Sequence, residues 1–439
     1  MKNLTLSSAL LLLLVPFYSS SAVVVESWVT GNKVPVLFVQ VPDIEMVDIH
    51  LAFDAGSSRD GVTYGLSNIV SELVLQGAGD LNVESFNEEL GLTGGILTSG
   101  TSLDIGYIKA RSLTGNTSLS AVVRLLKLAL STPRFDRPDV DRVLARTLME
   151  LEYKKQSPSA VADENLNAQL FAPHPYGYPR LGTAKTVSSI TRDNVVNFFE
   201  KFYVSRNLNI SRVGALNSRE AKRIAEEISS VLSAGSPAEK IPVEQFNAMH
   251  STLVTKNFPS IQSHIRVGAR SVGRGHPDYF PLLVANHALG GNSLVSVLFR
   301  SIREERGLAY SAYSYFAPKL EGGSLVAALQ TDGGSQEEAI EVLDGALEQL
   351  RLEGFTQKDI DSAKNNLIGG FALRVDTNGK ILNYLAMIGF YGLPLNYLTT
   401  FADKVNEITR EQASKVFNEY FSPEKRVTVV IGSRQAGDE

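Results

Sequence analysis

The sequence feature that most restricts the fold is an internal repeat. Residues 190–193 (Ile-Thr-Arg-Asp) lead into a Phe-rich helical segment and then a strand that ends at Gly214. Residues 408–411 (Ile-Thr-Arg-Glu) lead into the same succession, which ends at Gly432. The starts are 408 − 190 = 218 residues apart and the ends 432 − 214 = 218, so the unit recurs without a net gap. Because self-similarity at a fixed spacing means that one structural unit is present twice, we predict two homologous domains.

The order of elements within each copy indicates the fold class. Each copy opens with a strand, a glycine-containing turn and an apolar helix, and long helices and a final strand follow. Helices segregated onto one face of a mostly antiparallel sheet make an α+β fold. We therefore predict an α+β protein with two homologous domains, each a mostly antiparallel sheet with helices packed on one face. The pattern predicts strands at 48–54, 265–268 and 325–331, a hairpin within 94–108, and helices at 66–75, 119–130, 280–289, 336–352 and 357–373, with a further helix running through 152.

Composition places the domain boundaries. The stretch Ser233–Pro242 (SAGSPAEKIP) is polar and rich in Pro, Gly and Ser, which is typical of a linker. We place the linker at 233–244, the N-terminal domain at 23–232 and the C-terminal domain at 245–439. Each domain then has about 200 residues, within the usual range.

Residues 1–22 have the pattern of a signal peptide. Lys2 gives a basic start, an apolar core follows, and Ser20–Ala22 resembles a small-residue cleavage site. An uncleaved membrane anchor is the alternative, but the apolar core is shorter than the ~20 residues that a span needs. We expect a periplasmic or secreted protein with no membrane span after signal removal.

Composition also excludes several kinds of chemistry. The chain contains no cysteine, which rules out disulfides, a thiol nucleophile and thiolate metal sites. Its formal net charge is −5 and its basic residues are scattered, so nucleic acid is not an expected partner. The remaining possibility is a globular protein that is stabilised by core packing alone.

The helix predicted after Gly65 has a spacing typical of a metal site. Asn68 and Glu72 lie four residues apart and share a face, and Ser71 precedes Glu72. In the inverted zincin motif, H-x-x-E-H, two histidines at this spacing hold zinc and the intervening glutamate activates water. The segment and its flanks, Ala55–Arg59 before it and Leu75–Gly77 after it, resemble the pitrilysin/insulinase family of metallopeptidases.

The resemblance implies a zinc site that has lost its ligands. Asn68 and Glu72 stand at the histidine positions, and Ser71 stands at the glutamate position. Glu150 matches the position of the third zinc ligand of the family. These oxygen donors suit zinc poorly, and a weakly bound Mg²⁺ or Ca²⁺ is an alternative to plain polar residues lining a cavity. No two of the six histidines lie four apart, so we expect no metal and no cofactor in this chain.

A second part of the family pattern is intact. Residues 298–316 read as an amphipathic helix that ends at Gly307, followed by an alternating strand. The resemblance places the arginine and tyrosine of the family, which bind substrate from the domain opposite the zinc, on Arg303 and Tyr310. A guanidinium can hold a peptide carbonyl, and a phenol can stabilise an oxyanion. The alternative is that Arg303 pairs with a neighbouring glutamate and Tyr310 packs in the sheet.

Two further motifs resemble family elements. Residues 94–99 (Gly-Gly-Ile-Leu-Thr-Ser) resemble an edge strand that accepts an extended peptide, although a purely structural hairpin is the preferred interpretation. His174–Gly177 matches a family loop, which we interpret as structural because a lone histidine beside proline is seldom a ligand.

Together these features predict a function without catalysis by the chain itself. We expect an exported, non-catalytic subunit of a heteromeric zinc metallopeptidase, with a zinc-bearing H-x-x-E-H paralogue as heterodimer partner and peptides as substrate. Zinc is expected in the partner chain. The resemblance implies a relative of metallopeptidases that is inactive alone and active only within a complex. The alternative is a purely structural or peptide-binding module with no role in proteolysis. An active zinc peptidase would need ligands that the sequence lacks.

Overall fold

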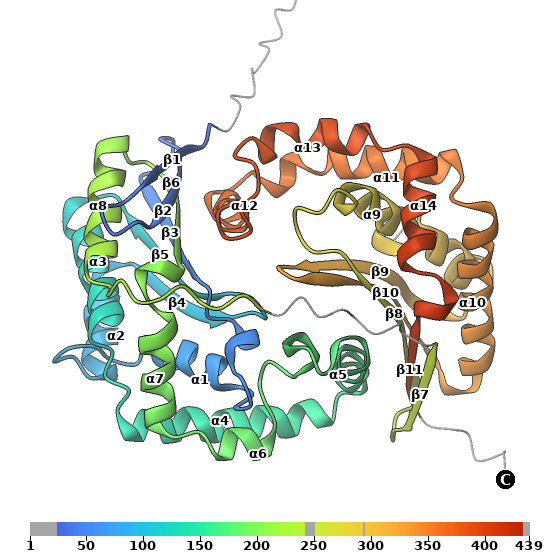
Figure 1. Cartoon of the computed structure of the whole chain (residues 1–439), viewed down its shortest axis with the longest axis horizontal. Helices are drawn as coiled ribbons and strands as arrows, with labels where there is room; N and C mark the ends of the chain where they lie inside the picture. Colours follow the sequence, from blue (N-terminus) through green and yellow to red (C-terminus); the bar gives the residue numbers. More distant parts are fainter. Residues whose placement is uncertain (1–23, 242–250, 293–294, 433–439) are drawn as a thin grey trace, which may run out of the picture.

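The computed structural model describes residues 24–241, 251–292 and 295–432, which form two halves, each built on one mixed β-sheet (Figure 1). The predicted signal peptide, residues 242–244 of the predicted linker and the first and last residues of the predicted C-terminal domain lie outside the described residues. No helix in the described ranges combines the length and hydropathy that crossing a membrane requires.

The N-terminal half has a six-stranded sheet of order β1-β2-β6-β3-β5-β4. Only β2 and β6 pair in parallel, and the other neighbours are antiparallel. The strands are β1 (Glu26–Val29), β2 (Pro35–Gln40), β3 (Met46–Phe53), β4 (Ile96–Thr101), β5 (Gly106–Leu113) and β6 (Leu208–Gly214). The helices are α1 (Leu66–Leu73), α2 (Val83–Thr93), α3 (Asn116–Ser131), α4 (Arg137–Lys155), α5 (Pro158–Phe171), α6 (Ala184–Ser188), α7 (Arg192–Phe202) and α8 (Ser218–Ser230).

The C-terminal half has a five-stranded sheet of order β7-β11-β8-β10-β9, in which only β7 and β11 are parallel. Its strands are β7 (Thr252–Asn257), β8 (Gln262–Ser271), β9 (Ala309–Lys319), β10 (Gly322–Asp332) and β11 (Val427–Gly432). Its helices are α9 (Tyr279–Asn286), α10 (Gln336–Glu353), α11 (Gln357–Gly369), α12 (Asn378–Phe390), α13 (Tyr397–Asn406) and α14 (Arg410–Tyr420). The helix predicted at 357–373 is shorter than expected, and the segments 287–291 and 299–304 are π-helical.

The repeat has a direct structural counterpart. The order β2-β6-β3-β5-β4 in one sheet corresponds to β7-β11-β8-β10-β9 in the other. Helices α7 and α14 begin 410 − 192 = 218 residues apart, and capping boxes built on Thr191 and Thr409 fix both starts. The predicted α+β fold is therefore confirmed, with two related halves and mostly antiparallel sheets.

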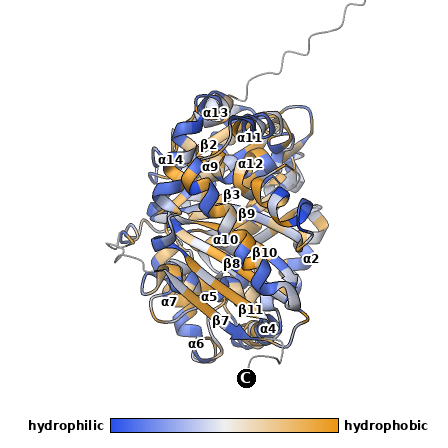
Figure 2. Ribbon diagram, turned by 90° about the vertical axis from the view of Figure 1, so that its right-hand side faces the viewer, coloured by the Kyte–Doolittle hydropathy of each residue, from blue (hydrophilic) through white to orange (hydrophobic). Residues whose placement is uncertain are grey.

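Each half has its own apolar core between its sheet and its helices. In the N-terminal half, Ile69, Val70 and Leu73 of α1 are completely buried, and each such side chain contributes roughly 1.5–3 kcal/mol relative to exposure. Figure 2 shows hydrophobic residues gathered in the strands, whereas outer helices such as α6 and α14 carry hydrophilic ones. The helices of each half therefore cover one face of its own sheet, as predicted.

The second face of each sheet receives a helix from the other half, which the repeat alone did not predict. Helix α5 of the N-terminal half packs on β8 and β11, and Leu166 lies against Gly268. Helix α12 of the C-terminal half packs on β2, β3 and β6 (Figure 1). The starts of these helices lie 378 − 158 = 220 residues apart, so they occupy equivalent places in the repeat. The two halves are joined reciprocally.

Asp104, in the turn between β4 and β5, adds a polar connection between the halves. Its carboxylate accepts hydrogen bonds from the hydroxyl of Tyr176 (2.5 Å), the hydroxyl of Tyr391 (2.9 Å) and the N–H of Leu320 (3.0 Å). Tyr391 and Leu320 belong to the C-terminal half. Asp104 is 3% exposed, so these bonds are shielded from water.

The described part of the predicted linker is mostly exposed but attached to the N-terminal half. The N–H of Ser205 donates to the carbonyl of Ser233 (2.9 Å), and the N–H of Ala238 donates to Oδ1 of Asn207 (2.7 Å). Ile241, at the end of this segment, is buried. The segment is therefore held at both its beginning and its end.

Candidate functional site

Helix α1 carries the residues at the zinc-motif positions, and a side chain from outside the helix fixes its start. Gly65 precedes it with φ of 95°, which favours glycine, and the carbonyl oxygen of Leu181 would lie 2.6 Å from any Cβ there. The Asp60 carboxylate accepts hydrogen bonds from the N–H groups of Gly65 (2.7 Å) and Ser67 (2.8 Å). Burial raises the pKa of Asp60 to about 7 even though both bonds favour the carboxylate.

The predicted shared face of α1 is confirmed. Nδ2 of Asn68 donates to Oε1 of Glu72 at 2.9 Å. Ser71 is completely buried, and its hydroxyl donates to the carbonyl of Asn68 at 2.8 Å. The residue at the position of the water-activating glutamate is therefore a buried hydroxyl bonded to its own helix, and it offers no carboxylate as a general base.

Two arginines occupy the remaining acceptors of this face. Nη1 of Arg180 donates to Oδ1 of Asn68 at 2.6 Å, and Nη2 of Arg146 forms an ion pair with Oε2 of Glu72. The Glu72 side chain is 24% exposed and that of Arg146 is 53% exposed, so the pair lies at the edge of the core. A cation arriving here would have to displace two guanidinium groups and would be repelled by them.

The donor set does not fit zinc. Glu150 is exposed on α4, and no hydrogen bond joins it to Asn68 or Glu72 in the described ranges. Within residues 24–241, 251–292 and 295–432, no three His, Cys, Asp or Glu side chains form a group that could hold a metal. One amide and one carboxylate, both already bonded to arginine, cannot replace the nitrogen-rich tetrahedral set that zinc prefers.

Arg303 lies in the π-helical segment 299–304. Its guanidinium stands 5.2 Å from the ring centre of Phe299, a cation–π contact. In the described part of the chain it forms no ion pair, so the pairing with a neighbouring glutamate that we considered is absent. π-Helical turns occur frequently at functional sites.

Tyr310 is set apart from the regular sheet by a bulge in β9. Ser311 pairs with Gln330 and Ala309 with Thr331, which leaves Tyr310 without a partner across the strand pair. Its side chain is 87% exposed, so the alternative that it packs in the sheet is wrong. Bulges near functional sites commonly redirect a side chain. No hydrogen bond in the described ranges links Arg303 or Tyr310 to Asn68 or Glu72. Their predicted role in binding substrate stays a prediction.

β4 in the N-terminal half and β9 in the C-terminal half are edge strands, each paired on one side alone among the strands that the structure describes. The predicted hairpin within 94–108 is confirmed as β4 and β5, and its first strand is also a sheet edge, as the family resemblance implied. His174 is completely buried, and its Nδ1 accepts a hydrogen bond from the N–H of Tyr176, which agrees with a structural role.

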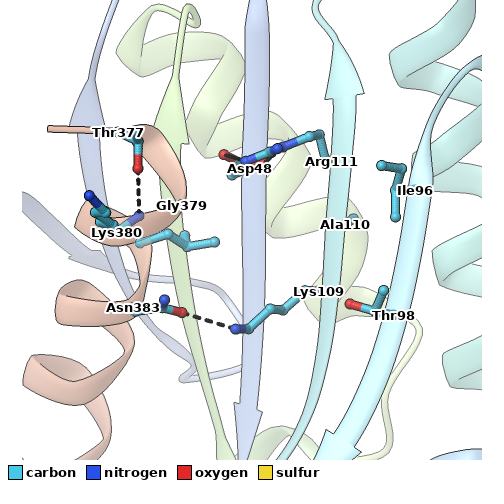
Figure 3. Close-up of a pocket in the computed structure, with 11 residues that line it drawn as sticks. Asp48, Ile96, Thr98, Lys109, Ala110, Arg111, Thr377, Gly379, Lys380 and Asn383 are labelled. Carbon is cyan, nitrogen blue, oxygen red and sulfur yellow. Dashed lines mark hydrogen bonds and ion pairs between the residues drawn. The ribbon is translucent and has the colours of Figure 1, made fainter. Parts of the chain in front are cut away.

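Sequence reasoning missed several polar residues. Arg146 lies 74 residues from its acceptor Glu72, and Arg180 lies 112 residues from its acceptor Asn68, so no local sequence pattern predicts these contacts. Lys109 and Arg111 line a cavity between the halves (Figure 3). They could have been noticed, because residues two apart in a strand such as β5 share one face.

Comparisons with known proteins agree with this geometry. Residues 36–184 match the family described as Insulinase (Peptidase family M16), and residues 189–367 match the Peptidase M16 inactive domain. A solved structure of a peptidase M16 inactive domain from Pseudomonas fluorescens is 30% identical, with a TM-score of 0.89 and coverage of 93% of this chain and 98% of that chain. This chain belongs to peptidase family M16, the insulinase family. The resemblance inferred from α1 and from residues 298–316 is thus confirmed at the level of the family.

Curated M16 relatives carry two kinds of name. One is a non-peptidase homolog, YmxG, from Helicobacter pylori, which is 26% identical with coverage of 87% of both chains. Another is an uncharacterized zinc protease, also named YmxG, from Bacillus subtilis, which is 24% identical over 81% of this chain and 86% of that protein.

Proposed function

We propose that this M16 protein is an exported, non-catalytic subunit of a heteromeric zinc metallopeptidase. The observation that carries the proposal is the state of helix α1. There, Asn68 and Glu72 are bonded to each other and to arginines, and Ser71 is bonded to its own helix. Water activation needs a metal ligand set and a general base, and α1 offers neither. Zinc then comes from an H-x-x-E-H paralogue that forms a heterodimer with this chain.

The contribution of this chain to the complex is to hold the peptide. The bulge at Tyr310 and its 87% exposure support this, because a phenol that is not packed in the sheet can donate to an oxyanion. Arg303 presents its guanidinium on an exposed π-helical turn and can hold a peptide carbonyl. The name of the Helicobacter pylori relative, a non-peptidase homolog, supports a role outside catalysis. Export is supported by the signal-peptide pattern of residues 1–22.

A second candidate is a peptide-binding or structural module with no role in proteolysis. The open edge strand β4, which lies beside a cavity between the halves, favours it, since a peptide could be held there without a partner. The two candidates differ in whether the Tyr310 hydroxyl matters for turnover.

The test is reconstitution with the zinc-bearing paralogue. Tyr310→Phe removes only a hydroxyl from an exposed side chain, so assembly should be unchanged. Loss of one oxyanion donor typically lowers turnover by about 10²–10³, and we expect at least about a tenfold loss. Tyr313→Phe, on the same strand and 37% exposed, is the matched control and should keep full turnover.

Unchanged turnover in Tyr310→Phe would favour the peptide-binding or structural module. Arg303→Ala is a less clean variant, because its guanidinium also stacks on Phe299.

A further inference from the structure

A cavity of about 360 Å³ lies between the N-terminal sheet and the start of helix α12 from the C-terminal half (Figure 3). Strands β3, β4 and β5 provide one wall of this inter-half pocket, and Gly379, Lys380 and Asn383 provide the opposite wall. At Gly379 a Cβ would lie 3.4 Å from Nη2 of Arg111, so the start of α12 lies close to the side chains of β5. The pocket belongs to neither half alone.

Pairing of β4, β5 and β3 aligns their side chains in rows across the sheet. The first row that lines the pocket contains a cation whose charge is already neutralised. Ile96, Arg111 and Asp48 are neighbours across β4, β5 and β3. The Arg111 guanidinium pairs with the Asp48 carboxylate through two bonds, Nε to Oδ1 at 2.6 Å and Nη2 to Oδ2 at 2.9 Å. Such a bidentate pair leaves little charge to attract a ligand.

The second row holds a cation without a carboxylate beside it. Thr98, Lys109 and His50 are the neighbours across the same strands. Nζ of Lys109 donates to the amide oxygen of Asn383 at 2.9 Å, and it lies 5.1 Å from the ring centre of Tyr107. Burial, helped by Lys109, lowers the pKa of His50 to about 3, so His50 is neutral. Lys109 therefore has neutral neighbours in its own row. Burial lowers the pKa of Lys109, and the charge of Asp48 in the first row opposes this shift.

The helix wall contributes a second lysine whose charge is largely engaged. Lys380 lines the pocket, but its Nζ pairs with Asp376 at 2.7 Å and donates to the carbonyl of Leu373 at 2.7 Å. The first turn of α12, capped by Thr377, also lines the pocket, and a helix N-terminus carries a partial positive charge. Of the three cations in the lining, Arg111 and Lys380 each have a carboxylate as ion partner, and Lys109 is bonded to the neutral amide of Asn383.

The position of β4 indicates what could deliver a negative group. β4 is an edge strand, so its outer backbone groups can pair with an added extended peptide. Ile96 and Thr98 share one face of β4, both are exposed, and both line the pocket. Because side chains alternate along a strand, every second side chain of an added peptide would lie on this same face.

We propose that the inter-half pocket binds a carboxylate of an extended peptide that lies along β4, with Lys109 as the main ion partner. The carboxylate is either an acidic side chain or the C-terminus of the peptide. This inference rests on the proposed function, because it names the class of peptide that the chain would hold. It gives the chain a preference for acidic peptides that is independent of zinc.

The experiment measures peptide binding to the purified mature chain alone by fluorescence anisotropy. Four labelled peptides of about ten residues, long enough to cover β4, carry Glu or Gln at the centre and a free or amidated C-terminus. We expect a carboxylate to tighten binding about tenfold, the effect of one charge-assisted hydrogen bond. A preference for Glu identifies a side-chain carboxylate, and a preference for the free C-terminus identifies the terminal one.

Variants decide whether the preference arises in the pocket. Lys109→Met should remove most of the carboxylate preference, and Lys380→Met, whose Nζ is paired with Asp376, should reduce it less, while binding of the neutral, amidated peptide stays the same in both. Lys358→Met, an exposed lysine on α11 outside the pocket, is the control for loss of one charge and should keep the preference. Circular dichroism verifies that each variant is folded.

Equal binding of all four peptides, no binding at all, or a preference that survives in both pocket variants would overturn the inference. The proposed function is judged separately by turnover of the reconstituted complex, so the two can fail independently.

Discussion

Replacing Asp104 by alanine should weaken the junction between the two halves. Asp104 is 3% exposed and accepts hydrogen bonds from Tyr176 in its own half and from Tyr391 and Leu320 in the other. Its charge also favours the protonated form of Lys319, whose pKa burial lowers to about 8. Asp104→Ala removes the shared acceptor of all three donors and the carboxylate whose charge favours protonated Lys319.

The size of the effect follows from the two bonds that cross between the halves. A hydrogen bond to a charged group contributes about 1.5–3 kcal/mol, so the pair represents roughly 3–6 kcal/mol. Bonds that share one acceptor are not additive, and we expect a loss of about 3–5 kcal/mol. Tyr391→Phe removes a single one of these bonds and should cost about 1.5–3 kcal/mol.

The single tryptophan makes the assay specific for one half. Trp28 lies in β1 and packs edge-on against Phe38, with ring centres 6.4 Å apart, so its fluorescence reports unfolding of the N-terminal half. Far-ultraviolet circular dichroism reports both halves. In urea, we expect the two signals to coincide for the wild type, because α5 and α12 couple the halves, and to separate for Asp104→Ala.

The control is Asp403→Ala, an exposed aspartate on α13, which should change stability by no more than about 0.5 kcal/mol. If Asp104→Ala lost less than about 1 kcal/mol and kept coincident transitions, Asp104 would not join the halves and the reasoning would be refuted.

Three further predictions concern metal, linker and pH. The purified mature chain should hold no stoichiometric zinc and cleave no unstructured peptide, and elemental analysis that found one zinc per chain with chelator-sensitive activity would contradict this. Limited proteolysis should cut first within 233–244, and the fragments should stay together in gel filtration because each contributes a helix to the other's sheet; separation under native conditions would argue against this coupling. The pKa of His50 falls from 6.5 unfolded to about 3 folded, so the unfolded chain binds the extra proton and stability is lost as pH falls from 6.5 to 3. His50→Asn should flatten this dependence by up to about 1.4 kcal/mol per pH unit, measured by urea unfolding at several pH values, and an unchanged slope would mean that His50 does not titrate in this way.

The parts of the fold that sequence alone could predict are those encoded by local chemistry. Thr191 and Thr409 each begin a helix with the same reciprocal cap, so the repeat was readable from a few residues. The face shared by Asn68 and Glu72 follows from helical geometry and needs no knowledge of tertiary structure.

What escaped prediction depends on contacts between distant segments. Helix α5 carries buried Ala162, Leu166 and Leu170 at helical spacing, which predicts an apolar stripe but not the sheet that it covers. The bulge that exposes Tyr310 shifts the register by one residue, and the alternating pattern of β9 gives no sign of it.

The arginines at helix α1 explain why the metal site is not merely missing a few ligands. A lone carboxylate left after the loss of both histidines would need a counter-charge at the edge of the core, and Arg146 supplies one to Glu72. Arg180 donates a hydrogen bond to the neutral amide oxygen of Asn68 and brings a second positive charge to this face. Returning histidine to positions 68 and 72 and glutamate to position 71 would leave both guanidinium groups facing the incoming cation without their acceptors. The charge around α1 is therefore arranged against a metal, and regaining zinc would require changes on α4 and after α5 as well as on α1 itself.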